Sequence, residues 1–373
     1  MKFELLYKSK KSRARVGKIH TPHGVINTPG FVAVGTNGTL KSIDNDVVEK
    51  IGLELMFCNT YHLLLQPGPQ VIKKAGGIHQ FSGRKTPIIT DSGGFQVFSL
   101  AYGGVADELK SRGQKKSDGH VLKITEEGVL FRSYRDGRRV LLTPESSIEA
   151  QKNIGADIII PLDELPPYHI DQDELRKSFD RTHRWEVRSL QEHLKNPQEQ
   201  AIYAVIHGGL DLALRKESCQ ILSDHPFDGF AIGGSMGKTK EQMITMLTET
   251  LPSLPEEKPN HLLGIADLPS LNECIPLGID TFDSSYPTRM ARHGTLLTDQ
   301  GPLKITRGVY SHDYAPIETD CCCPTCQNYS RAYINHLFKA KEMTALTLAS
   351  VHNLAYMIKT LKQIREKILD GEI

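Results

Sequence analysis

A short apolar run that ends in a polar or glycine-rich turn and is followed by a charged, helical stretch recurs along this chain of 373 residues. Apolar runs that alternate with helices predict buried parallel strands, because helices cover both faces of a parallel sheet. Six or more such units favour a (β/α)8 TIM-type barrel over a doubly wound open sheet, and no G-x-G-x-x-G motif follows an early run to support a dinucleotide site. The runs lie at residues 86–90, 156–162, 201–206, 230–232, 261–263 and 279–282.

The charge balance limits the kind of nucleic-acid binding that can be expected. The formal net charge is +1, whereas a non-specific nucleic-acid binder is normally far more basic, so any RNA contact must come from a local patch. No apolar run approaches membrane-spanning length, and no apolar core follows the basic residues near the N-terminus. We therefore expect a cytoplasmic protein without a membrane span or a secretory signal.

Four of the seven cysteines are crowded between Cys321 and Cys326, which is typical of a metal site in a reducing compartment rather than of a disulfide framework. Cys321, Cys323 and Cys326, with His352 as the candidate fourth ligand, satisfy one tetrahedral Zn²⁺. Four protein ligands leave no open position, so this zinc would be structural. Crowded thiols without metal, and His336 as a competing ligand, remain alternatives. The other cysteines are expected to lie outside the cluster, pointing away from it or packed in the core: Cys322, Cys58, Cys219 and Cys274.

Two stretches interrupt the repeated pattern. Residues 1–50 resemble antiparallel strands and turns, and residues from about Gly103 to His120 resemble a polar, lysine-rich surface loop. The expected organisation is a single catalytic barrel domain over residues 1–373. It begins with an antiparallel β segment and contains a zinc-binding subdomain at about 305–360.

Three aspartates, Asp91, Asp163 and Asp283, each follow an apolar run. The loops of a barrel converge at the carboxyl ends of its strands, so these carboxylates are expected to meet over the barrel mouth. Convergent carboxylates suit a reaction at a sugar carbon, in which one attacks and another moves protons. Each aspartate taken alone could instead cap a helix. The pattern by itself does not identify the substrate.

Five segments, in order and over nearly the whole chain, resemble the tRNA-guanine transglycosylase (queuine tRNA-ribosyltransferase) family of bacterial type. They are Asn59-Thr-Tyr-His-Leu, Asp91-Ser-Gly-Gly-Phe-Gln, Gly233-Gly234, Phe282-Asp-Ser-Ser-Tyr-Pro-Thr-Arg and Cys321-Cys-Cys-Pro-Thr-Cys with His352. The resemblance implies a (β/α)8 barrel with a zinc-binding insertion. It also implies exchange of guanine, at the anticodon wobble position of tRNAs that read Asp, Asn, His and Tyr codons, for queuine or its aminomethyl-deazaguanine precursor.

The same resemblance implies roles for two of the aspartates. Asp283 matches the nucleophile, which attacks the ribose anomeric carbon, expels guanine and leaves a covalent enzyme–RNA intermediate. Asp91 matches the general acid/base for the departing and arriving bases. Two displacements retain the anomeric configuration and predict ping-pong kinetics. Asp280, three residues before the nucleophile, is interpreted as structural.

Base contacts carry over by motif. Phe95 matches the aromatic residue that stacks on the base, Ser92 and Asp163 match contacts to its polar edge, and Gly234 offers backbone where a side chain would block the approach. The full set of expected base-binding residues is Ser92, Gly93, Gly94, Phe95, Asp163, His207, Gly233, Gly234 and Leu263.

RNA contacts are implied in the same way. Arg289 and Arg292 lie in a segment that matches the part of the family that contacts RNA around the wobble base, where they would hold flanking phosphates or bases. The target base must leave its stack, so base flipping from the anticodon loop is expected. The expected RNA-binding residues are Gly264, Ile265, Ala266, Asp267, Leu268, Pro269, Ser270, Thr288, Arg289, Met290, Ala291 and Arg292.

Several positions depart from the usual bacterial pattern. His207 stands where the family usually has a base-contacting Gln; it either donates one hydrogen bond to a carbonyl or is a plain strand-end histidine. Leu165 replaces a Cys. Gly237 replaces a Val and would leave room for the cyclopentenediol of queuine, which favours queuine as the incoming base. The loop from Gly103 to His120 is an insertion that either extends the tRNA contact or decorates the surface.

Three rival interpretations explain parts of the same pattern. A non-catalytic tRNA-binding subunit of the same family would have lost the nucleophile, but Asp91 and Asp283 stand in intact motifs. An archaeal-type enzyme would carry further C-terminal RNA-binding domains, for which about twenty residues after His352 leave no room. A glycosidase unrelated to RNA would not explain the cysteine cluster. Because family members are commonly homodimers, a homodimer is expected.

Overall fold

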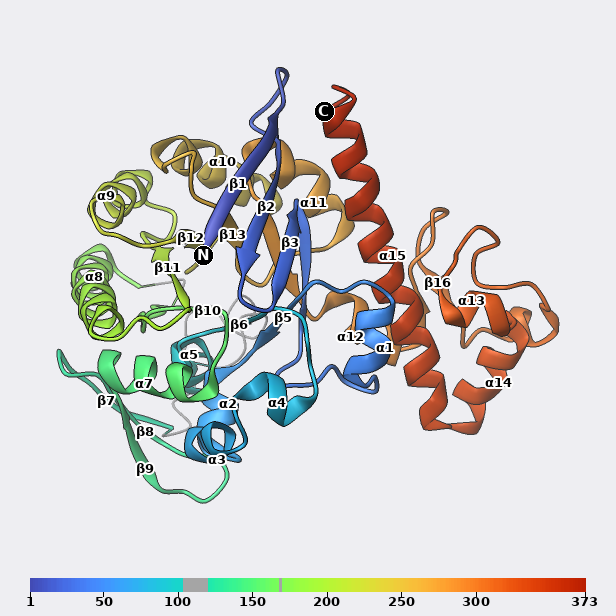
Figure 1. Cartoon of the computed structure of the whole chain (residues 1–373), viewed down its shortest axis with the longest axis horizontal. Helices are drawn as coiled ribbons and strands as arrows, with labels where there is room; N and C mark the ends of the chain where they lie inside the picture. The colour runs from blue at the N-terminus through green and yellow to red at the C-terminus, as the bar shows by residue number, and fades with distance from the viewer. Residues whose placement is uncertain (103–119, 168–169) are drawn as a thin grey trace.

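The computed structural model describes residues 1–102, 120–167 and 170–373. Eight parallel strands close into a barrel, and each strand pairs with the next one along the chain (Figure 1). The last strand pairs with the first, with Phe282 opposite Phe31, which completes the circle. The predicted TIM-type barrel is thereby confirmed. Its strands are β4 (Gly30–Val34), β5 (Leu55–Cys58), β6 (Ile88–Thr90), β10 (Ile158–Ile159), β11 (Ala201–Ile206), β12 (Gly229–Ile232), β13 (Asn260–Leu262) and β14 (Thr281–Ser284).

Side-chain alternation along each strand divides the core into an inner and an outer layer. In β5, Leu55 and Phe57 join the cluster inside the barrel, whereas Met56 and Cys58 pack outward against the helices, as a period of two requires. The covering helices are α1 (Asn45–Lys50), α2 (Thr60–Leu65), α3 (Pro69–Lys74), α4 (Ile78–Ser82), α5 (Gly94–Tyr102), α7 (Pro144–Ile154), α8 (Gln172–Leu194), α9 (Leu212–Ser223), α10 (Lys240–Thr250), η1 (Leu251–Ser253), α11 (Leu268–Cys274), η2 (Ile275–Leu277) and α12 (Tyr286–Arg292).

An antiparallel sheet of β1 (Lys2–Lys8), β2 (Arg15–Thr21) and β3 (Gly24–Thr28) lies against the barrel end where the strands begin. Its Ile19 and Ile26 join the inner cluster and so cover that end. The expected antiparallel segment is confirmed for these three strands, but it is wrong from residue 30 onward. There β4 is a fully apolar barrel strand and α1 is a helix, and both belong to the parallel repeat that the sequence pattern first shows later in the chain.

A second antiparallel sheet, which the sequence did not predict, is inserted between α5 and α7. It consists of β7 (Val121–Ile124), β8 (Val129–Arg132) and β9 (Arg139–Leu142). Phe131 of β8 packs with Tyr61 of α2 and Trp185 of α8, so this sheet is anchored to the barrel by its own apolar cluster. The predicted loop from Gly103 lies outside the described residues, except for His120.

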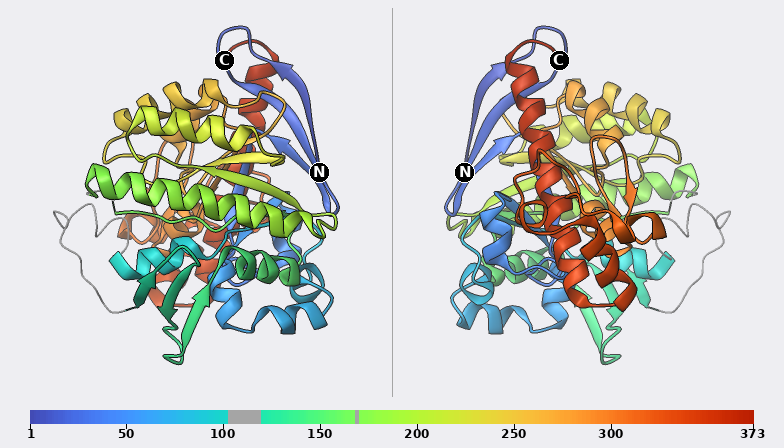
Figure 2. Two further views of the ribbon diagram at one scale, coloured as in Figure 1. Left: turned by 90° about the vertical axis from the view of Figure 1, so that its left-hand side faces the viewer. Right: turned by 90° about the vertical axis from the view of Figure 1, so that its right-hand side faces the viewer.

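The C-terminal segment forms a separate lobe, at the right of Figure 1. It contains β15 (Thr295–Leu296), β16 (Leu303–Lys304), η3 (Gly308–His312), α13 (Pro324–Asn328), α14 (Arg331–Ala340) and α15 (Met343–Leu369). Figure 2 shows the long α15 running from this lobe along the barrel wall to the N-terminal sheet. Ser330 caps α14 by accepting a hydrogen bond from the Tyr333 amide. None of the helices in the described ranges has both the length and the apolar character that a bilayer crossing requires.

Candidate active site

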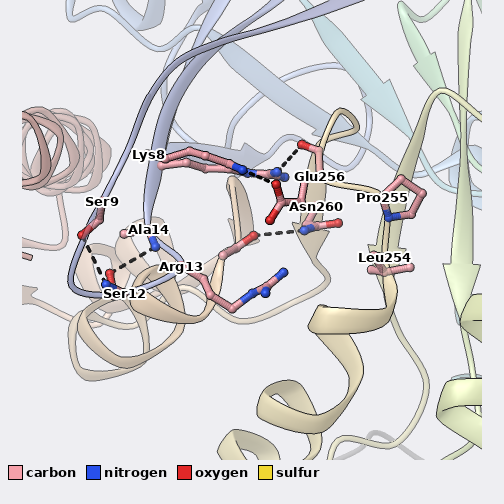
Figure 3. Close-up of a pocket in the computed structure, with 11 residues that line it drawn as sticks. Lys8, Ser9, Ser12, Arg13, Ala14, Leu254, Pro255, Glu256 and Asn260 are labelled. Atoms are coloured by element: carbon pink, nitrogen blue, oxygen red, sulfur yellow. Dashed lines mark hydrogen bonds and ion pairs between the residues drawn. The ribbon is translucent and has the colours of Figure 1, made fainter.

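The three predicted carboxylates lie at the same rim of the barrel. Asp91 directly follows β6, Asp163 follows β10, and Asp283 lies in β14 near its end. Parallel strands end on one face, so these side chains open toward one mouth. A cavity of about 150 Å³ lies elsewhere, near the starts of the strands; Figure 3 shows its lining, which includes Lys8 and Glu256 but none of the predicted site residues.

Asp91 is buried and accepts hydrogen bonds on both oxygens. The backbone amides of Thr60 and Gly93 donate to Oδ1 at 2.8 and 3.1 Å. The side-chain amides of Asn59 and Gln96 donate to Oδ2 at 2.6 and 2.8 Å. Burial raises the pKa of this carboxyl to about 6, although the four donors lower it in part. A carboxyl that titrates near neutral pH can both give and take a proton.

Asp283 is also buried, but only one of its oxygens is held. The Gly264 amide donates to Oδ1 at 2.8 Å, and His261 Nε2 lies 3.1 Å from the same oxygen. The other ring nitrogen of His261 lies 2.8 Å from Thr281 Oγ1, so the ring is fixed at both ends. An ionised carboxylate only accepts, which places the proton on Nε2. Within the described residues Oδ2 has no hydrogen-bond partner, so this carboxyl keeps one oxygen available for another group.

Asp163 and His207 approach each other after β10 and β11, and His207 also borders a small recess that faces α8. Ser92 Oγ lies 3.2 Å from Asp163 Oδ1, and His207 Nε2 lies 3.1 Å from Asp163 Oδ2. The second contact lacks the alignment of a hydrogen bond, which leaves the buried Nε2 without a hydrogen-bond partner among the described residues. A Cβ at Gly234 would lie 3.3 Å from His207 Nδ1, so the glycine allows the two loops to approach. The recess is lined by His207, Gly208, Gly209, Gly234, Ser235, Glu164, Pro166, Leu175, Ser178, Phe179 and Thr182.

A buried arginine that the sequence did not single out fixes the loops around this recess. Arg215, on α9, donates to the carbonyls of Ile206, Gly209 and Ser235 at 2.6, 2.9 and 3.0 Å. It therefore ties the loop after β11 to the loop after β12. His261 was not predicted either, because it lies within an apolar run. A histidine within a buried strand, next to a strand that carries a carboxylate, could have been used as a signal.

The remaining predicted contacts are distributed between surface and interior. Phe95 is 46% exposed, as a stacking surface for a base must be, and Gly264, Pro269 and Arg289 are exposed. Ala266, Ser270, Thr288 and Ala291 are buried, and Leu263, Ile265, Asp267, Leu268, Met290 and Arg292 are partly buried. These residues lie in the segments that follow β6, β13 and β14, and their binding roles stay predictions.

Two further positions can be placed. Gly237 has a φ of +97°, and a Cβ there would lie 2.7 Å from Gln242 Cβ. The backbone conformation and this contact therefore favour glycine at position 237 whatever the size of the ligand. Asp280 is fully buried and forms two bonds with Arg15, at 2.8 and 2.5 Å, which confirms its structural role.

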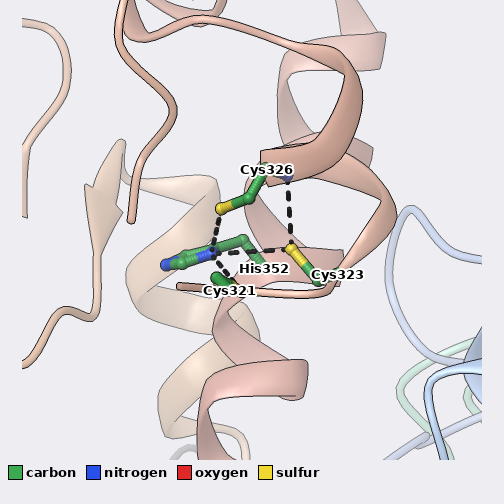
Figure 4. A group of neighbouring side chains, drawn as sticks. All are labelled: Cys321, Cys323, Cys326 and His352. Atoms are coloured by element: carbon green, nitrogen blue, oxygen red, sulfur yellow. Dashed lines mark hydrogen bonds between the residues drawn. The ribbon is translucent and has the colours of Figure 1, made fainter. Parts of the chain in front are cut away.

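The C-terminal lobe brings the four predicted metal ligands together (Figure 4). The sulfurs of Cys321, Cys323 and Cys326 lie 3.9, 3.7 and 3.3 Å from His352 Nδ1. A tetrahedral zinc ion with ordinary bond lengths separates sulfur from nitrogen by about 3.5 Å, so the spacing fits a metal such as zinc. His352 Nε2 lies 2.8 Å from the Leu297 carbonyl, an outer contact that leaves Nδ1 free for the metal.

The other residues considered for this cluster lie apart from it. Cys322 is exposed, as predicted, and His336 is exposed on α14. Cys58, Cys219 and Cys274 are buried core residues, also as predicted. The structure thus selects His352 over His336.

Fold and site together define a barrel enzyme with carboxylates at its mouth and a Cys3His lobe. A family model described as queuine tRNA-ribosyltransferase matches residues 9–373. A queuine tRNA-ribosyltransferase of Protochlamydia amoebophila is 70% identical over 372 residues, covering 100% of this chain and 96% of that protein. One of Chlamydia caviae is 55% identical over 374 residues, covering 100% of each. The chain therefore belongs to the queuine tRNA-ribosyltransferase family, which are glycosyltransferases, as the resemblance predicted.

Proposed function

We propose that this enzyme exchanges guanine at the anticodon wobble position of tRNAs for Asp, Asn, His and Tyr by double displacement. The observation that supports this most directly is the contrast between the two catalytic aspartates. Asp91 is a carboxyl with a raised pKa of about 6, suited to proton transfer. Asp283 keeps one oxygen free among the described residues and the other fixed, as a nucleophile requires.

In the first displacement, Asp283 Oδ2 attacks the ribose anomeric carbon. The glycosidic bond to guanine breaks with its electron pair, and protonated Asp91 supplies the proton that guanine needs. In the second, Asp91 takes a proton from the incoming base, whose nitrogen attacks the same carbon and releases the Asp283 carboxylate. Two inversions return the original configuration.

The side chains that follow β6, β10 and β11 supply groups suited to a purine-like base. Asp163 and Ser92 offer acceptors and a hydroxyl to its polar edge, and His207 Nε2 is a hydrogen-bonding atom that the described residues leave unused. Phe95 stands exposed for stacking. Queuine is the favoured incoming base over the aminomethyl precursor. Gly237 is consistent with this choice, and its contacts with Gln242 also require a glycine.

Cys321, Cys323, Cys326 and His352 would hold one Zn²⁺ in this scheme. With four protein ligands the ion supplies structural cross-linking and no open coordination position. It would join the segment around α13 to α15, which in turn contacts the barrel through Asn353, a donor to the Pro287 carbonyl at 2.9 Å.

A homodimer is proposed on the basis of the C-terminal lobe. Val309, Tyr314 and Met343 are 74%, 78% and 80% exposed, and Tyr329 and Tyr333 stack with ring centroids 5.5 Å apart on the same lobe. Exposed apolar groups of this size are characteristic of interfaces. Size measurement of the pure protein by light scattering, with Tyr333→Arg as the comparison, tests the dimer. We place the reaction in the cytoplasm, where the zinc thiolates would stay reduced.

The exchange is tested with purified protein and tRNA that carries labelled guanine at the wobble position. Queuine and the aminomethyl precursor are offered separately, with Asp283→Ala as the control. Release of label with queuine, lost in the variant, supports the exchange and the choice of base. Release only with the aminomethyl precursor would overturn the choice of queuine. Release with neither base would favour the alternative, a non-catalytic tRNA-binding subunit.

A further inference from the structure

The hairpin formed by β8 and β9 concentrates positive charge on one exposed surface. Arg132, Arg135, Arg138 and Arg139 are all exposed, and Asp136 is the one carboxylate among the residues of these strands and their turn. The surplus is three positive charges in a chain whose net charge is +1. We call these four arginines the arginine hairpin.

The arrangement of these charges is unfavourable for the hairpin alone. Arg132 and Arg139 are directly opposite each other in the strand register, and like charges at such positions repel. Asp136 is 3.4 Å from Arg138, whereas Arg132, Arg135 and Arg139 form no ion pair with any described residue. An anionic partner bound at this surface would relieve the repulsion.

The nearest acidic residues of the inserted sheet do not supply that partner. Glu126, in the turn between β7 and β8, is 2.8 Å from Arg184 of α8. That turn is at the opposite end of β8 from the arginine hairpin. Among the described residues, the positive charge therefore faces solvent with Asp136 as its only paired carboxylate.

Contacts with α2 place this hairpin beside the barrel mouth. Tyr134, at the tip, is 48% exposed; its ring centroid is 5.9 Å from that of Tyr61, and its hydroxyl is 3.3 Å from His62 Nδ1. Thr60, the first residue of the same helix, donates its amide to Asp91. The turn that carries the arginine hairpin is thus packed, through Tyr134, on α2, and the first residue of α2 holds the proposed acid/base Asp91.

The positive charges near α2 also affect the His62 imidazole. Its pKa is lowered first by burial and then by the charges of Lys41 and Arg135. Lys41 lies on the loop after β4 and is exposed, so positive groups from two different loops surround α2.

We propose that the arginine hairpin binds the phosphodiester backbone of the tRNA substrate beside the flipped wobble nucleotide. This inference rests on the proposed function, because it assumes that the substrate is tRNA. Guanidinium groups match the geometry of phosphate oxygens in a bidentate manner. Such contacts fix the register of the RNA without reading its sequence, which suits an enzyme that serves several tRNAs.

The test uses Arg139→Glu in the full-length enzyme. The new carboxylate stands opposite Arg132 and replaces a repulsion with an attraction, so the melting temperature should stay the same or rise. The KM for tRNA should rise roughly tenfold, and the dependence of binding on salt should weaken by about 0.7 to 1 in the log–log slope, the share of one phosphate contact. The kcat at saturating tRNA should not change.

The matched control is Lys362→Glu, an exposed residue on α15 that undergoes the same charge reversal. It should leave KM and the salt slope unchanged. If Arg139→Glu keeps the wild-type KM and slope, or if the control changes them equally, the proposal is wrong. If Arg139→Glu does not fold, the turn variant Arg135→Gln with Arg138→Gln repeats the measurement with the same criteria.

Failure of the proposed function would look different. Wild-type protein would then release no guanine with either base, whereas binding of tRNA can still be followed by fluorescence anisotropy. Loss of that binding in Arg139→Glu would support the surface even without exchange. If the wild-type protein exchanges guanine but Arg139→Glu binds tRNA as tightly as wild type, the proposed binding surface is wrong and the proposed function still stands.

Discussion

Asp91 and Asp283 occupy the same barrel rim, yet their surroundings differ in the number of donors and in where those donors point. Asp91 receives four hydrogen bonds that use both oxygens, and burial still raises its pKa to about 6. Asp283 is held through Oδ1 by Gly264 and His261. Two similarly buried carboxyls therefore differ in their donors: Asp91 is held through both oxygens and Asp283 through one, a difference that suits the proton transfer and the attack proposed for them.

The largest expected effect separates the two roles directly. Asp283→Asn removes the nucleophile and should leave no covalent enzyme–RNA adduct on a denaturing gel. Asp91→Asn should still form some adduct, but slowly, because guanine departs without its proton. Both variants should lower kcat by at least about a thousandfold, in the range known for lost acid/base groups. An adduct in Asp283→Asn at the wild-type level would reverse the assignment.

The raised pKa of Asp91 also predicts a pH dependence of folding. The unfolded carboxyl releases its proton near its ordinary value of 3.8 and the folded one near 6, so the native state binds more protons between these values. Stability contributed by this group is therefore present at low pH and is lost as pH rises from about 4 to about 6, by up to about 3 kcal/mol. Urea unfolding of wild type and Asp91→Asn across this range should show a steeper decline in wild type. Parallel curves would mean that burial does not raise the pKa.

The smallest effect concerns how Asp283 is aimed. His261→Phe removes the donor to Oδ1 and should lower kcat about tenfold, the cost of one hydrogen bond to a charged group, while the KM for tRNA stays unchanged. His261→Gln keeps a donor and should recover part of the rate. The pH–rate bend assigned to Asp91 should not move in either variant. If only the KM for tRNA changes, or if His261→Gln does not recover part of the kcat, His261 has a structural role and does not position Asp283.

Several site residues can be predicted from the residues next to them in the sequence. Asp91 and Asp283 follow apolar runs, and Cys321, Cys323 and Cys326 are spaced as metal ligands, so each could be found from its neighbours in the chain. The barrel followed from the repeated runs, although β4 and β5 were not recognised among them. The inserted β7–β9 sheet was missed because its strands are short and half exposed.

Other features could not be found in this way. His261 sits inside an apolar run, and its partner Asp283 is 22 residues away. Arg215 is buried and donates to three carbonyls, one at the end of β11 and two in the loops after β11 and β12. A charged residue on a helix is usually solvent-exposed, so nothing local marks Arg215 as buried.

The sequence by itself determined the periodic alternation of strands and helices, the strand-end carboxylates and the cysteine spacing, because these depend on short-range chemistry. Only the tertiary structure decided which oxygen of Asp283 is free, why Asp91 titrates near neutral pH, and which histidine completes the metal cluster. These properties depend on burial and on partners brought together from distant parts of the chain. Burial and distance are set when the barrel closes, and no local pattern encodes them.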